Sequence, residues 1–311
     1  MVQSAGLAHA SLSPRPVHLA IGMFDGVHLG HRSVIEAAVQ SARRSGGIAA
    51  VLTFAPHPSV LFRPDNPTPL IMDMETKAAC LQQLGVEVLI VEPFTPNYAK
   101  IAAEEFLPHL RIHLPLLAAV YVGENWRFGQ GRRGDVTLLI QEGRRLGLGV
   151  FSAPRVNLDG EPISSTRIRT LLAAGDVVTA NRLFGHTYAA RGVITAGKRL
   201  GRTIGFPTLN VAWSPALRPK FGVYAVRVLG SKSAVSLCGV ANYGLRPTVE
   251  QVTLPCLETH VFGECPFGEG DEISVEWLRF LRSEMKFSGL EELIPLSAFW
   301  GPLAQLVRAF R

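Results

Sequence analysis

The sequence predicts two domains: an α/β domain with a doubly wound parallel sheet, followed by a small antiparallel β-barrel. Three observations support this fold class. The chain has 311 residues, enough for two hydrophobic cores. In its first half, apolar runs alternate with segments of helical periodicity, which is typical of a parallel sheet covered by helices. From Tyr188 onward the apolar segments are short, alternating and separated by glycine and proline, which favours a barrel. The pattern changes near Gly185, so we predict domains of residues 1–186 and 187–311.

Composition restricts the function classes. With 47% hydrophobic and 18% charged residues the chain is globular, and it contains no apolar run of the ~18 residues that cross a bilayer. Residues 1–16 do not form a secretory signal, and we expect a leader without regular structure. The four cysteines show no CxxC spacing, so we expect reduced thiols. We also expect a cytoplasmic protein that is a monomer or weak homo-oligomer. The net charge of +6 suits anionic small molecules such as ATP; because no basic run is interleaved with aromatic residues, we expect no nucleic-acid partner.

The elements of the first domain follow from its apolar runs. The run from Val17 to Ile21 predicts a buried strand, and it leads into a helix that stops at Gly46. Further strands are expected over Ile48–Phe54, Val86–Val91, Leu116–Val122 and Gly147–Ala153, and helices over Glu75–Leu84, Ile101–Leu110 and from the N-cap Asp135 to about Leu146. The unusual loops FDGVHLGH, FAPHP and GENWRFGQGRRGD all follow strands. Parallel sheets bind ligands at the carboxyl ends of their strands, so we expect the site there.

The segment GMFDGVHLGH after the first strand is the most informative stretch. Its glycines allow close backbone approach to a ligand, and the start of the next helix offers free N–H groups and the positive end of a dipole. His28 and His31 are three residues apart and fall on one helix face, where they can stabilise the charge that develops on a phosphate. An ordinary turn with two surface histidines is the alternative, and the combination of strand, turn and helix favours the anion site.

A second candidate phosphate site is the segment ISSTRIR, residues 163–169. Ser164 or Ser165 can cap a helix that runs to Ala174 and is broken by Gly175. Hydroxyl groups, free N–H groups and Arg169 come together at this helix start. The alternative is an ordinary serine N-cap with two solvated arginines.

In the second domain the informative stretch is GKRLGRTIGFPTLN, residues 197–210. Its three glycines form a loop able to wrap phosphates, and Thr208 and Asn210 share one face of the next strand, both offering oxygen to Mg²⁺. A glycine-rich hairpin with a polar outer face is the alternative. The barrel strands are expected over Tyr188–Thr195, Thr208–Val211, Gly222–Leu229, Ala234–Ala241, Leu257–Phe262 and Ile273–Phe280, and a terminal helix over about Leu290–Phe310.

These motifs resemble those of a known family. FDGVHLGH is similar to the HxGH signature of nucleotidyltransferases, ISSTRIR to their second signature, and GFPTLN to the GxPTAN signature of riboflavin kinases. From Val17 to Phe287 the chain resembles the bacterial bifunctional riboflavin kinase/FMN adenylyltransferase family. The resemblance implies ATP-dependent phosphorylation of riboflavin to FMN by the barrel, and adenylylation of FMN to FAD by the first domain. The chain departs from the family over residues 261–271 and at Asn125-Trp126.

The resemblance also implies roles for individual residues. His28, His31 and Glu258 would be catalytic, with Glu258 taking the proton of the riboflavin 5′-hydroxyl. The other expected contacts are Gly22, Phe24, Asp25, Gly30, Asn125, Ser165, Thr166 and Arg169 for ATP in the adenylyltransferase site, Gly197, Lys198, Gly201, Gly205, Thr208 and Asn210 for ATP in the kinase site with Thr208 and Asn210 also holding Mg²⁺, and Phe54, His57, Pro58, Phe128, Arg282 and Glu284 for the flavin.

Three other functions remain open at this point. An adenylyltransferase of the same superfamily with another substrate does not explain GFPTLN or Glu258. A flavin-binding or regulatory homologue that keeps only one of the two activities stays open because of the altered 261–271 loop. An RNA-binding role rests only on the net charge.

Overall fold

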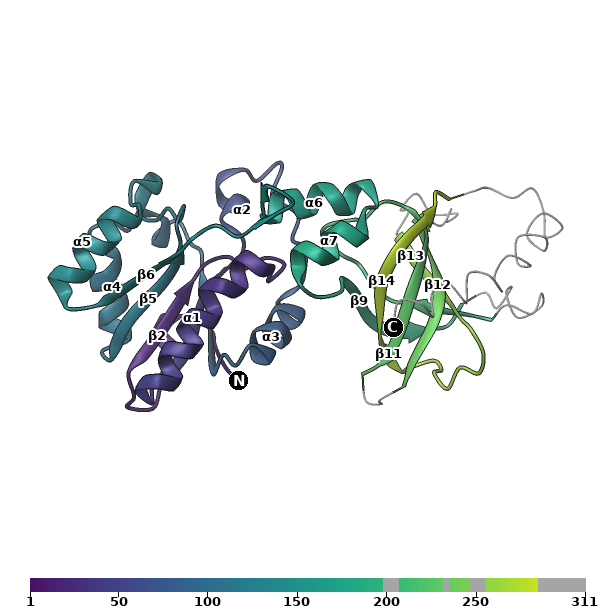
Figure 1. Ribbon diagram of the computed structural model, residues 1–311, viewed down its shortest axis with the longest axis horizontal. Helices are drawn as coiled ribbons and strands as arrows, with labels where there is room; N and C mark the ends of the chain where they lie inside the picture. The colour runs from purple at the N-terminus through teal and green to yellow at the C-terminus, as the bar shows by residue number, and fades with distance from the viewer. Residues whose placement is uncertain (198–206, 232–234, 246–254, 285–311) are drawn as a thin grey trace. The chain divides into compact units, whose positions relative to one another are not determined.

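The computed structural model describes residues 1–197, 207–231, 235–245 and 255–284 (Figure 1). The chain divides into two compact units, Met1–Ser165 and Thr166–Arg311, which we describe separately. Among the described helices, none has the length and apolar character needed to cross a membrane.

The first unit is built on a parallel sheet of six strands in the order β1-β4-β3-β2-β5-β6. The strands are β1 (Val2–Ser4), β2 (Val17–Ile21), β3 (Ile48–Ala55), β4 (Val88–Pro93), β5 (Leu117–Gly123) and β6 (Gly149–Ala153). All five residues of β2 are buried, because Leu19 and Ile21 join one hydrophobic core and Ala20 joins a second core. A strand buried on both faces reads as a continuous apolar run, and the predicted doubly wound sheet is confirmed.

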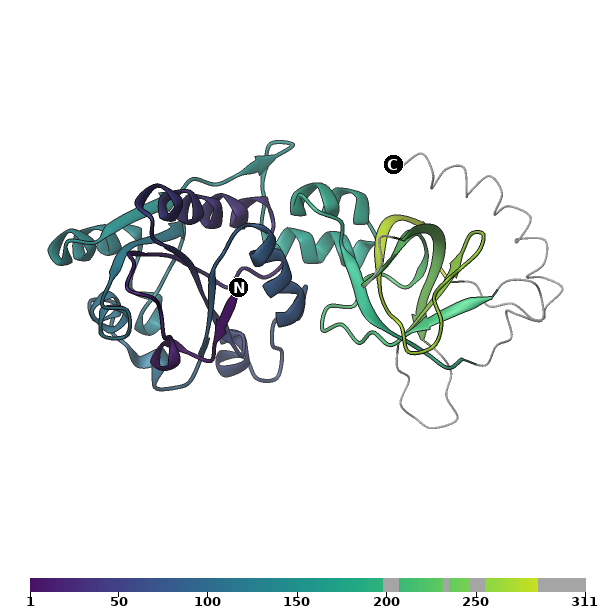
Figure 2. The ribbon, with the colours of Figure 1, turned by 90° about the horizontal axis from the view of Figure 1, so that it is seen from below.

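Helices cover both faces of this sheet (Figures 1 and 2). The helices of this unit are α1 (Leu29–Ser45), α2 (Pro58–Phe62), α3 (Met74–Gln83), α4 (Phe106–His113) and α5 (Val136–Leu146). The unit also contains the 3₁₀ turns η1 (Leu7–His9), η2 (Tyr98–Lys100) and η3 (Gln130–Arg132), and a small hairpin of β7 (Asn157–Leu158) and β8 (Glu161–Pro162). The predicted N-cap is confirmed, since the Asp135 carboxylate accepts a hydrogen bond from the Leu138 N–H at 3.0 Å.

The strand order determines where a ligand can bind. From β2 the chain adds β3 and β4 on one side of the sheet, and then β5 and β6 on the other. The carboxyl ends of β2 and β5 therefore lie next to each other at the point where the order reverses. In doubly wound sheets this is where ligands bind.

Two predictions for this unit were wrong. The leader is structured: Val2 pairs with Val88 in a parallel edge strand, and Leu7 is buried in the core. A three-residue strand with the sequence Val-Gln-Ser is too short to show periodicity. The helix expected over residues 101–110 begins only at Phe106, because Pro108 lacks an N–H and is tolerated in a first helical turn but not in a helix interior.

The second unit contains α6 (Ser165–Ala174), whose first residue closes the first unit, α7 (Val177–Phe184), and a closed antiparallel barrel in the order β10-β13-β12-β11-β14-β9. Its strands are β9 (Ala189–Thr195), β10 (Thr208–Val211), β11 (Gly222–Gly230), β12 (Ser236–Leu245), β13 (Pro255–Val261) and β14 (Glu272–Arg282). The predicted six-stranded barrel is confirmed. Its core centres on the fully buried Trp277, whose ring contacts Tyr224 at 4.3 Å between centroids. The helix expected over Leu290–Phe310 lies outside the described residues.

Candidate active sites

The turn between β2 and α1 holds two histidines against each other. His28 caps α1, and its Nδ1 accepts a hydrogen bond from the backbone N–H of His31 at 3.2 Å. The two imidazole rings stack with centroids 3.5 Å apart, and the ring of the buried Phe24 packs edge-on against His31 at 5.4 Å. A side chain on Gly30 would crowd the His28 ring. The turn therefore places both imidazoles at the amino end of a helix, where backbone N–H groups favour an anion.

Two buried charged residues, Asp25 and Lys77, hydrogen-bond to the backbone at and around this turn. The Asp25 carboxylate, only 2% exposed, accepts hydrogen bonds from the backbone N–H of Ile71 at 3.0 Å and of Met72 at 3.4 Å. The ammonium group of Lys77, also buried, donates to the carbonyl of Met23 at 2.8 Å. Burial lowers the pKa of Lys77, and the nearby Asp25 carboxylate opposes that shift. Asp25 thus connects the turn to the backbone at Ile71 and Met72.

Two further hydrogen bonds hold the same backbone. Thr53 at the end of β3 donates to the Met23 carbonyl at 3.1 Å, and Ser165 donates its hydroxyl proton to the Asp25 carbonyl at 2.9 Å. The structure thus brings the ISSTRIR segment to the HxGH turn through Ser165, the first residue of α6. Thr166 and Arg169 follow on that helix, and their roles stay a prediction.

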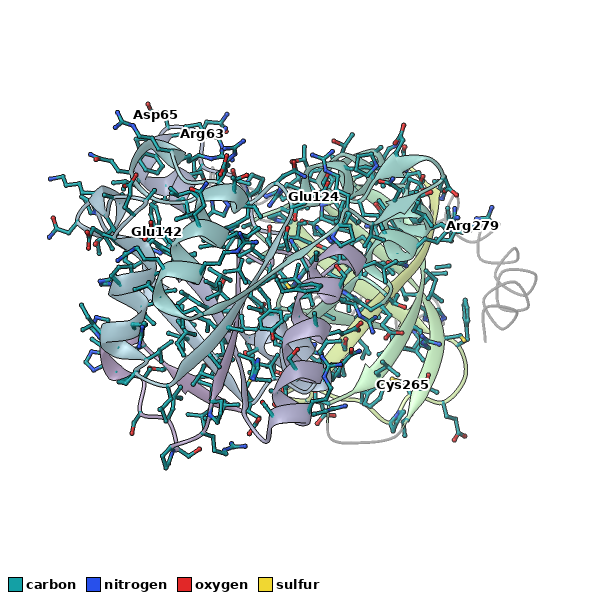
Figure 3. The ribbon with its side chains drawn as sticks, turned by 60° about the vertical axis from the view of Figure 1, so that its left-hand side comes forward. Arg63, Asp65, Glu124, Glu142, Cys265 and Arg279 are labelled. Atoms are coloured by element: carbon teal, nitrogen blue, oxygen red, sulfur yellow. The ribbon has the colours of Figure 1, made fainter. Side chains whose placement is uncertain are left out.

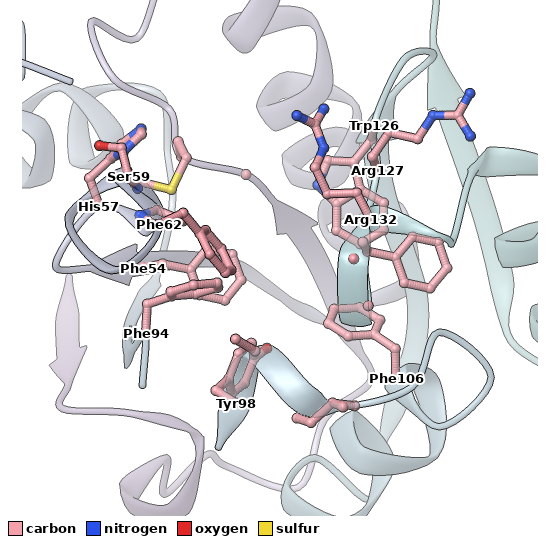
Figure 4. Close-up of a pocket in the computed structure, with 18 of the residues that line it drawn as sticks. Phe54, His57, Ser59, Phe62, Phe94, Tyr98, Phe106, Trp126, Arg127 and Arg132 are labelled. Atoms are coloured by element: carbon pink, nitrogen blue, oxygen red, sulfur yellow. The ribbon is translucent and has the colours of Figure 1, made fainter. Parts of the chain in front are cut away.

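A pocket of about 840 Å³ lies at the carboxyl ends of the strands. Figure 4 shows Phe54, Phe62 and Phe94 on one side of it and Trp126 and Phe106 on the other. Its lining residues include those predicted at Gly22, Phe54, His57, Pro58, Asn125 and Phe128, together with Phe62, Arg63, Phe94, Tyr98, Phe106, Trp126, Arg127 and Arg132. Aromatic walls with a few cationic groups suit a planar ligand that carries phosphate.

Several of these lining residues were missed from the sequence. Phe94 and Tyr98 follow the carboxyl end of β4, so the rule that located the other loops also points to them. Burial raises the pKa of Tyr98, and its hydroxyl has no hydrogen-bond partner among the described residues. The arginines Arg127 and Arg132 belong to the loop GENWRFGQGRRGD, of which only Asn125 and Phe128 were selected. Arg63 lies beside Asp65 on the exposed loop after α2 (Figure 3).

In the barrel, strand register brings together residues that are distant in sequence. Thr208 and Asn210 share the outer face of β10, where they pair with His260 and Glu258 of β13. Directly opposed residues of an antiparallel pair have Cβ atoms about 4.5–5.5 Å apart and point to the same face. Glu258 therefore lies beside Asn210, although 48 residues separate them.

The glycine-rich loop begins next to the same residues. A Cβ on Gly197 would contact the side-chain amide of Asn210, so the backbone approaches Asn210 as closely as only glycine permits. Lys198, Gly201 and Gly205 lie outside the described residues. No group of three His, Cys, Asp or Glu side chains suited to a metal occurs in the described part of the chain.

The two residues expected to bind flavin in the barrel lie at the end of β14 and just after it. The Glu284 carboxylate lies directly against Gly244 of β12, where it fills the place of a side chain. The Arg282 guanidinium donates to the Ser283 carbonyl at 3.1 Å. Gly244 pairs with Cys256, two residues before Glu258 on the same strand, so Glu284 lies close to Glu258.

Comparisons with known proteins match each half of the chain to its own family. The FAD synthetase family model matches residues 11–167, and the riboflavin kinase family model matches residues 184–296. The chain is 36% identical to a bifunctional riboflavin kinase/FMN adenylyltransferase of Escherichia coli strain K12, over 88% of this chain and 87% of that protein. It is 37% identical to the protein of that name from Bacillus subtilis strain 168, with the same coverage of 88% and 87%.

Among solved structures, the chain is similar to a crystal structure described as a macrolide-efflux protein from Streptococcus pneumoniae. The TM-score is 0.87 and the sequence identity 25%, with 98% of each chain covered. The similarity therefore includes both units.

Proposed function

This chain belongs to the bifunctional riboflavin kinase/FMN adenylyltransferase family, and from that premise we propose how its residues divide the two reactions. The activities are phosphorylation of riboflavin by ATP to FMN, and adenylylation of FMN by a second ATP to FAD with release of pyrophosphate. The observation that carries the assignment is that each unit has its own candidate site. In the first unit, the segment that carries the stacked histidines also contributes Gly22 and Met23 to an aromatic pocket, and in the second, Glu258 lies beside Asn210.

In the adenylyltransferase site, the aromatic pocket receives the flavin ring, and Asn125, Arg127 and Arg132 contact phosphate groups. An oxygen of the FMN phosphate attacks the α-phosphorus of ATP, and the bond from that phosphorus to the pyrophosphate oxygen breaks. The FMN phosphate is already a nucleophile, so no general base is required. His28 and His31 donate hydrogen bonds to the charge that builds up on the α-phosphate and on the leaving pyrophosphate.

Asp25 and Phe24 have a different role from ATP contact in this proposal. The Asp25 carboxylate is occupied by the N–H groups of Ile71 and Met72, and the Phe24 ring packs on His31. Both residues position the turn that carries the histidines. A carboxylate in contact with the triphosphate of ATP would also repel the phosphates.

In the kinase site, Glu258 accepts the proton of the riboflavin 5′-hydroxyl while that oxygen attacks the γ-phosphorus of ATP and the bond to the ADP oxygen breaks. The outer face of β10 suits a Mg²⁺ ion, because Thr208 and Asn210 offer side-chain oxygens there and the phosphates of ATP supply the rest. When bound, Mg²⁺ neutralises phosphate charge. Thr208 and Asn210 would hold it, and the close approach of the Gly197 backbone to Asn210 leaves no room there for a side chain.

The remaining assignments complete the proposal. Ser165, Thr166 and Arg169 contribute to phosphate binding in the first site, and Arg282 and Glu284 to flavin binding in the second. Residues 1–186 and 187–311 form the functional halves. We place the protein in the cytoplasm, as a monomer or a weak homo-oligomer.

The direct test incubates the purified chain with riboflavin, ATP and Mg²⁺ and separates FMN from FAD by chromatography. Both products should accumulate, and added FMN should give FAD without riboflavin. FMN alone from riboflavin with no FAD from added FMN, or FAD from added FMN with no product from riboflavin, would identify a homologue that has kept only one activity.

Glu258→Gln tests the assigned base. The change keeps the shape of the side chain and removes the proton acceptor, so riboflavin phosphorylation should fall by roughly 10²–10⁴. Adenylylation of added FMN should be unchanged and serves as the internal control. Undiminished kinase activity would move the base to another carboxylate, with Glu264, Glu269 and Asp271 of the altered loop as the next candidates.

A further inference from the structure

We propose that Arg132 is the residue by which the adenylyltransferase site selects FMN over riboflavin. Its guanidinium binds the 5′-phosphate, the one group that distinguishes the two molecules. This inference rests on the proposed function of the aromatic pocket as the flavin site, and it assigns the discrimination to a single residue. The flavin ring is the same in both molecules and fits the aromatic walls equally well, so the discrimination must come from a polar group of the pocket.

The charges of the pocket are all of one sign. Its described lining contains three arginines, at positions 63, 127 and 132, and neither aspartate nor glutamate. Two of these arginines have partners: Arg63 donates to the Thr68 hydroxyl at 2.9 Å, and Arg127 donates to the Asp135 carboxylate at 3.2 Å. No hydrogen bond or ion pair joins the Arg132 guanidinium to another described residue. A phosphate can therefore bind Arg132 without displacing an existing contact.

The backbone at Arg132 adopts a conformation that an arginine rarely takes. Its φ is +58°, in the left-handed region, and Gly129 and Gly131 of the same loop have φ values of +72° and +63°. Glycine reaches this region without cost, whereas a residue with a Cβ does not. A glycine at position 132 would serve the turn better. A non-glycine residue held in such a conformation beside a ligand pocket indicates that its side chain has a function there.

The loop that carries Arg132 is held at both ends and in the middle. Phe128 and Gly134 exchange two backbone hydrogen bonds, of 3.1 and 2.9 Å, and the N–H of Gln130 donates to the Ile101 carbonyl at 2.7 Å. Figure 4 shows Arg132 on the side of the pocket that also carries Trp126. A guanidinium on a fixed loop loses less conformational freedom when it binds, and its planar fork can donate to two oxygens of one phosphate.

The central experiment compares two ligands in the full-length Arg132→Ala protein. FAD formation from FMN and ATP gives the KM for FMN. The inhibitor 5′-deoxyriboflavin has the flavin ring and the ribityl chain but neither the phosphate nor the hydroxyl that the kinase site would phosphorylate. The KM for FMN should rise by about tenfold or more, because hydrogen bonds to a charged group are lost. The inhibition constant of 5′-deoxyriboflavin should stay at the wild-type value.

The matched control is Arg133→Ala. It removes the same charge from the next position of the loop, where the side chain is exposed and does not line the pocket. Both the KM for FMN and the inhibition constant should be those of the wild-type protein.

Two further variants separate the side chain from the backbone. Arg132→Gly should raise the KM for FMN as much as Arg132→Ala does, with a melting temperature no lower than that of the wild-type protein, because glycine adopts a positive φ freely. A lower melting temperature would show that the arginine stabilises the loop, and would overturn the argument from the backbone. Arg132→Lys should recover part of the affinity for FMN, since it keeps the charge without the fork.

The outcomes distinguish this inference from the function beneath it. If the wild-type chain forms no FAD from FMN and ATP, the proposed function is wrong and the inference falls with it. If it forms FAD but Arg132→Ala raises the KM for FMN no more than Arg133→Ala does, the site stands and Arg132 does not bind the flavin phosphate. An equal rise in the KM for FMN and in the inhibition constant of 5′-deoxyriboflavin would mean that Arg132 only shapes the ring pocket, which also refutes the inference. A rise confined to FMN supports it.

Discussion

The most direct test of the adenylyltransferase site is Gly30→Ala. Gly30 is the second residue of α1, and its N–H is one of the backbone donors at the start of the helix that would face a bound phosphate. An added Cβ would lie 3.2 Å from Cε1 and 3.3 Å from Nδ1 of His28. The substitution leaves every backbone donor in place and changes only the space available to one imidazole.

The expected loss follows from these distances. Carbon atoms in contact prefer about 3.5–4.0 Å, so the His28 ring must retreat by a few tenths of an ångström. A displacement of 1 Å costs on the order of 10² in rate, and about half of that displacement corresponds to roughly a tenfold loss. Stability should change in the opposite direction, because alanine favours a helix over glycine by up to about 1 kcal/mol.

The assay measures FAD formed from FMN and ATP at saturating and limiting substrate. Gly30→Ala should lower kcat/KM about tenfold, with riboflavin phosphorylation and melting temperature unchanged or improved. Gln40→Ala, at an exposed position of the same helix, is the matched control. A wild-type rate of FAD formation in Gly30→Ala would refute the argument that the His28 ring must occupy its present place.

Three further predictions concern the site, the domain division and pH. His31→Ala should lower FAD formation by roughly 10²–10³ while riboflavin still becomes FMN, and an equal loss of both products in a folded protein would argue against two independent sites. A fragment of residues 1–186 should adenylylate supplied FMN, and a fragment with a folded circular-dichroism spectrum but no such activity would contradict the division. Burial, with a smaller effect from Arg44, lowers the pKa of His18 below 6.5 in the folded protein, so the unfolded chain binds more protons. The free energy of unfolding should therefore decrease as the pH falls through 6.5, and urea unfolding at pH 7.5 and 5.5 should show a smaller decrease in His18→Gln.

Much of the fold was predictable because local pattern and global structure agree. Strands such as β2 and β3 are buried on both faces, so their apolar character is continuous and visible in one sequence. The barrel strands alternate between apolar and polar residues, and their predicted ends lie within a few residues of the observed ends. The edge strand β1 carries no such pattern, because its stability comes from pairing with β4 rather than from its own composition.

The candidate sites were predictable where backbone geometry demands particular residues. Glycine and histidine in the HxGH turn are visible in the sequence, since a helix start and a close approach both constrain residue type. Only some of the residues that line the pocket could be predicted from the sequence. Phe94 and Phe106 are ordinary apolar residues, and only the arrangement of the strand ends places them opposite one another. The pairing of Asn210 with Glu258 depends on register, which no local pattern specifies.

The anchoring of the β2–α1 turn has a consequence for how this motif can be transferred between proteins. The ten residues GMFDGVHLGH take their shape from Lys77 and from the backbone at Ile71, about fifty positions away in the chain. Grafted alone onto another strand–helix junction, they would leave the Asp25 carboxylate without the N–H groups of Ile71 and Met72 that hold it here. Transfer of the motif therefore requires the segment from Ile71 to Lys77 as well, because its backbone N–H groups hold Asp25 and its lysine holds the Met23 carbonyl.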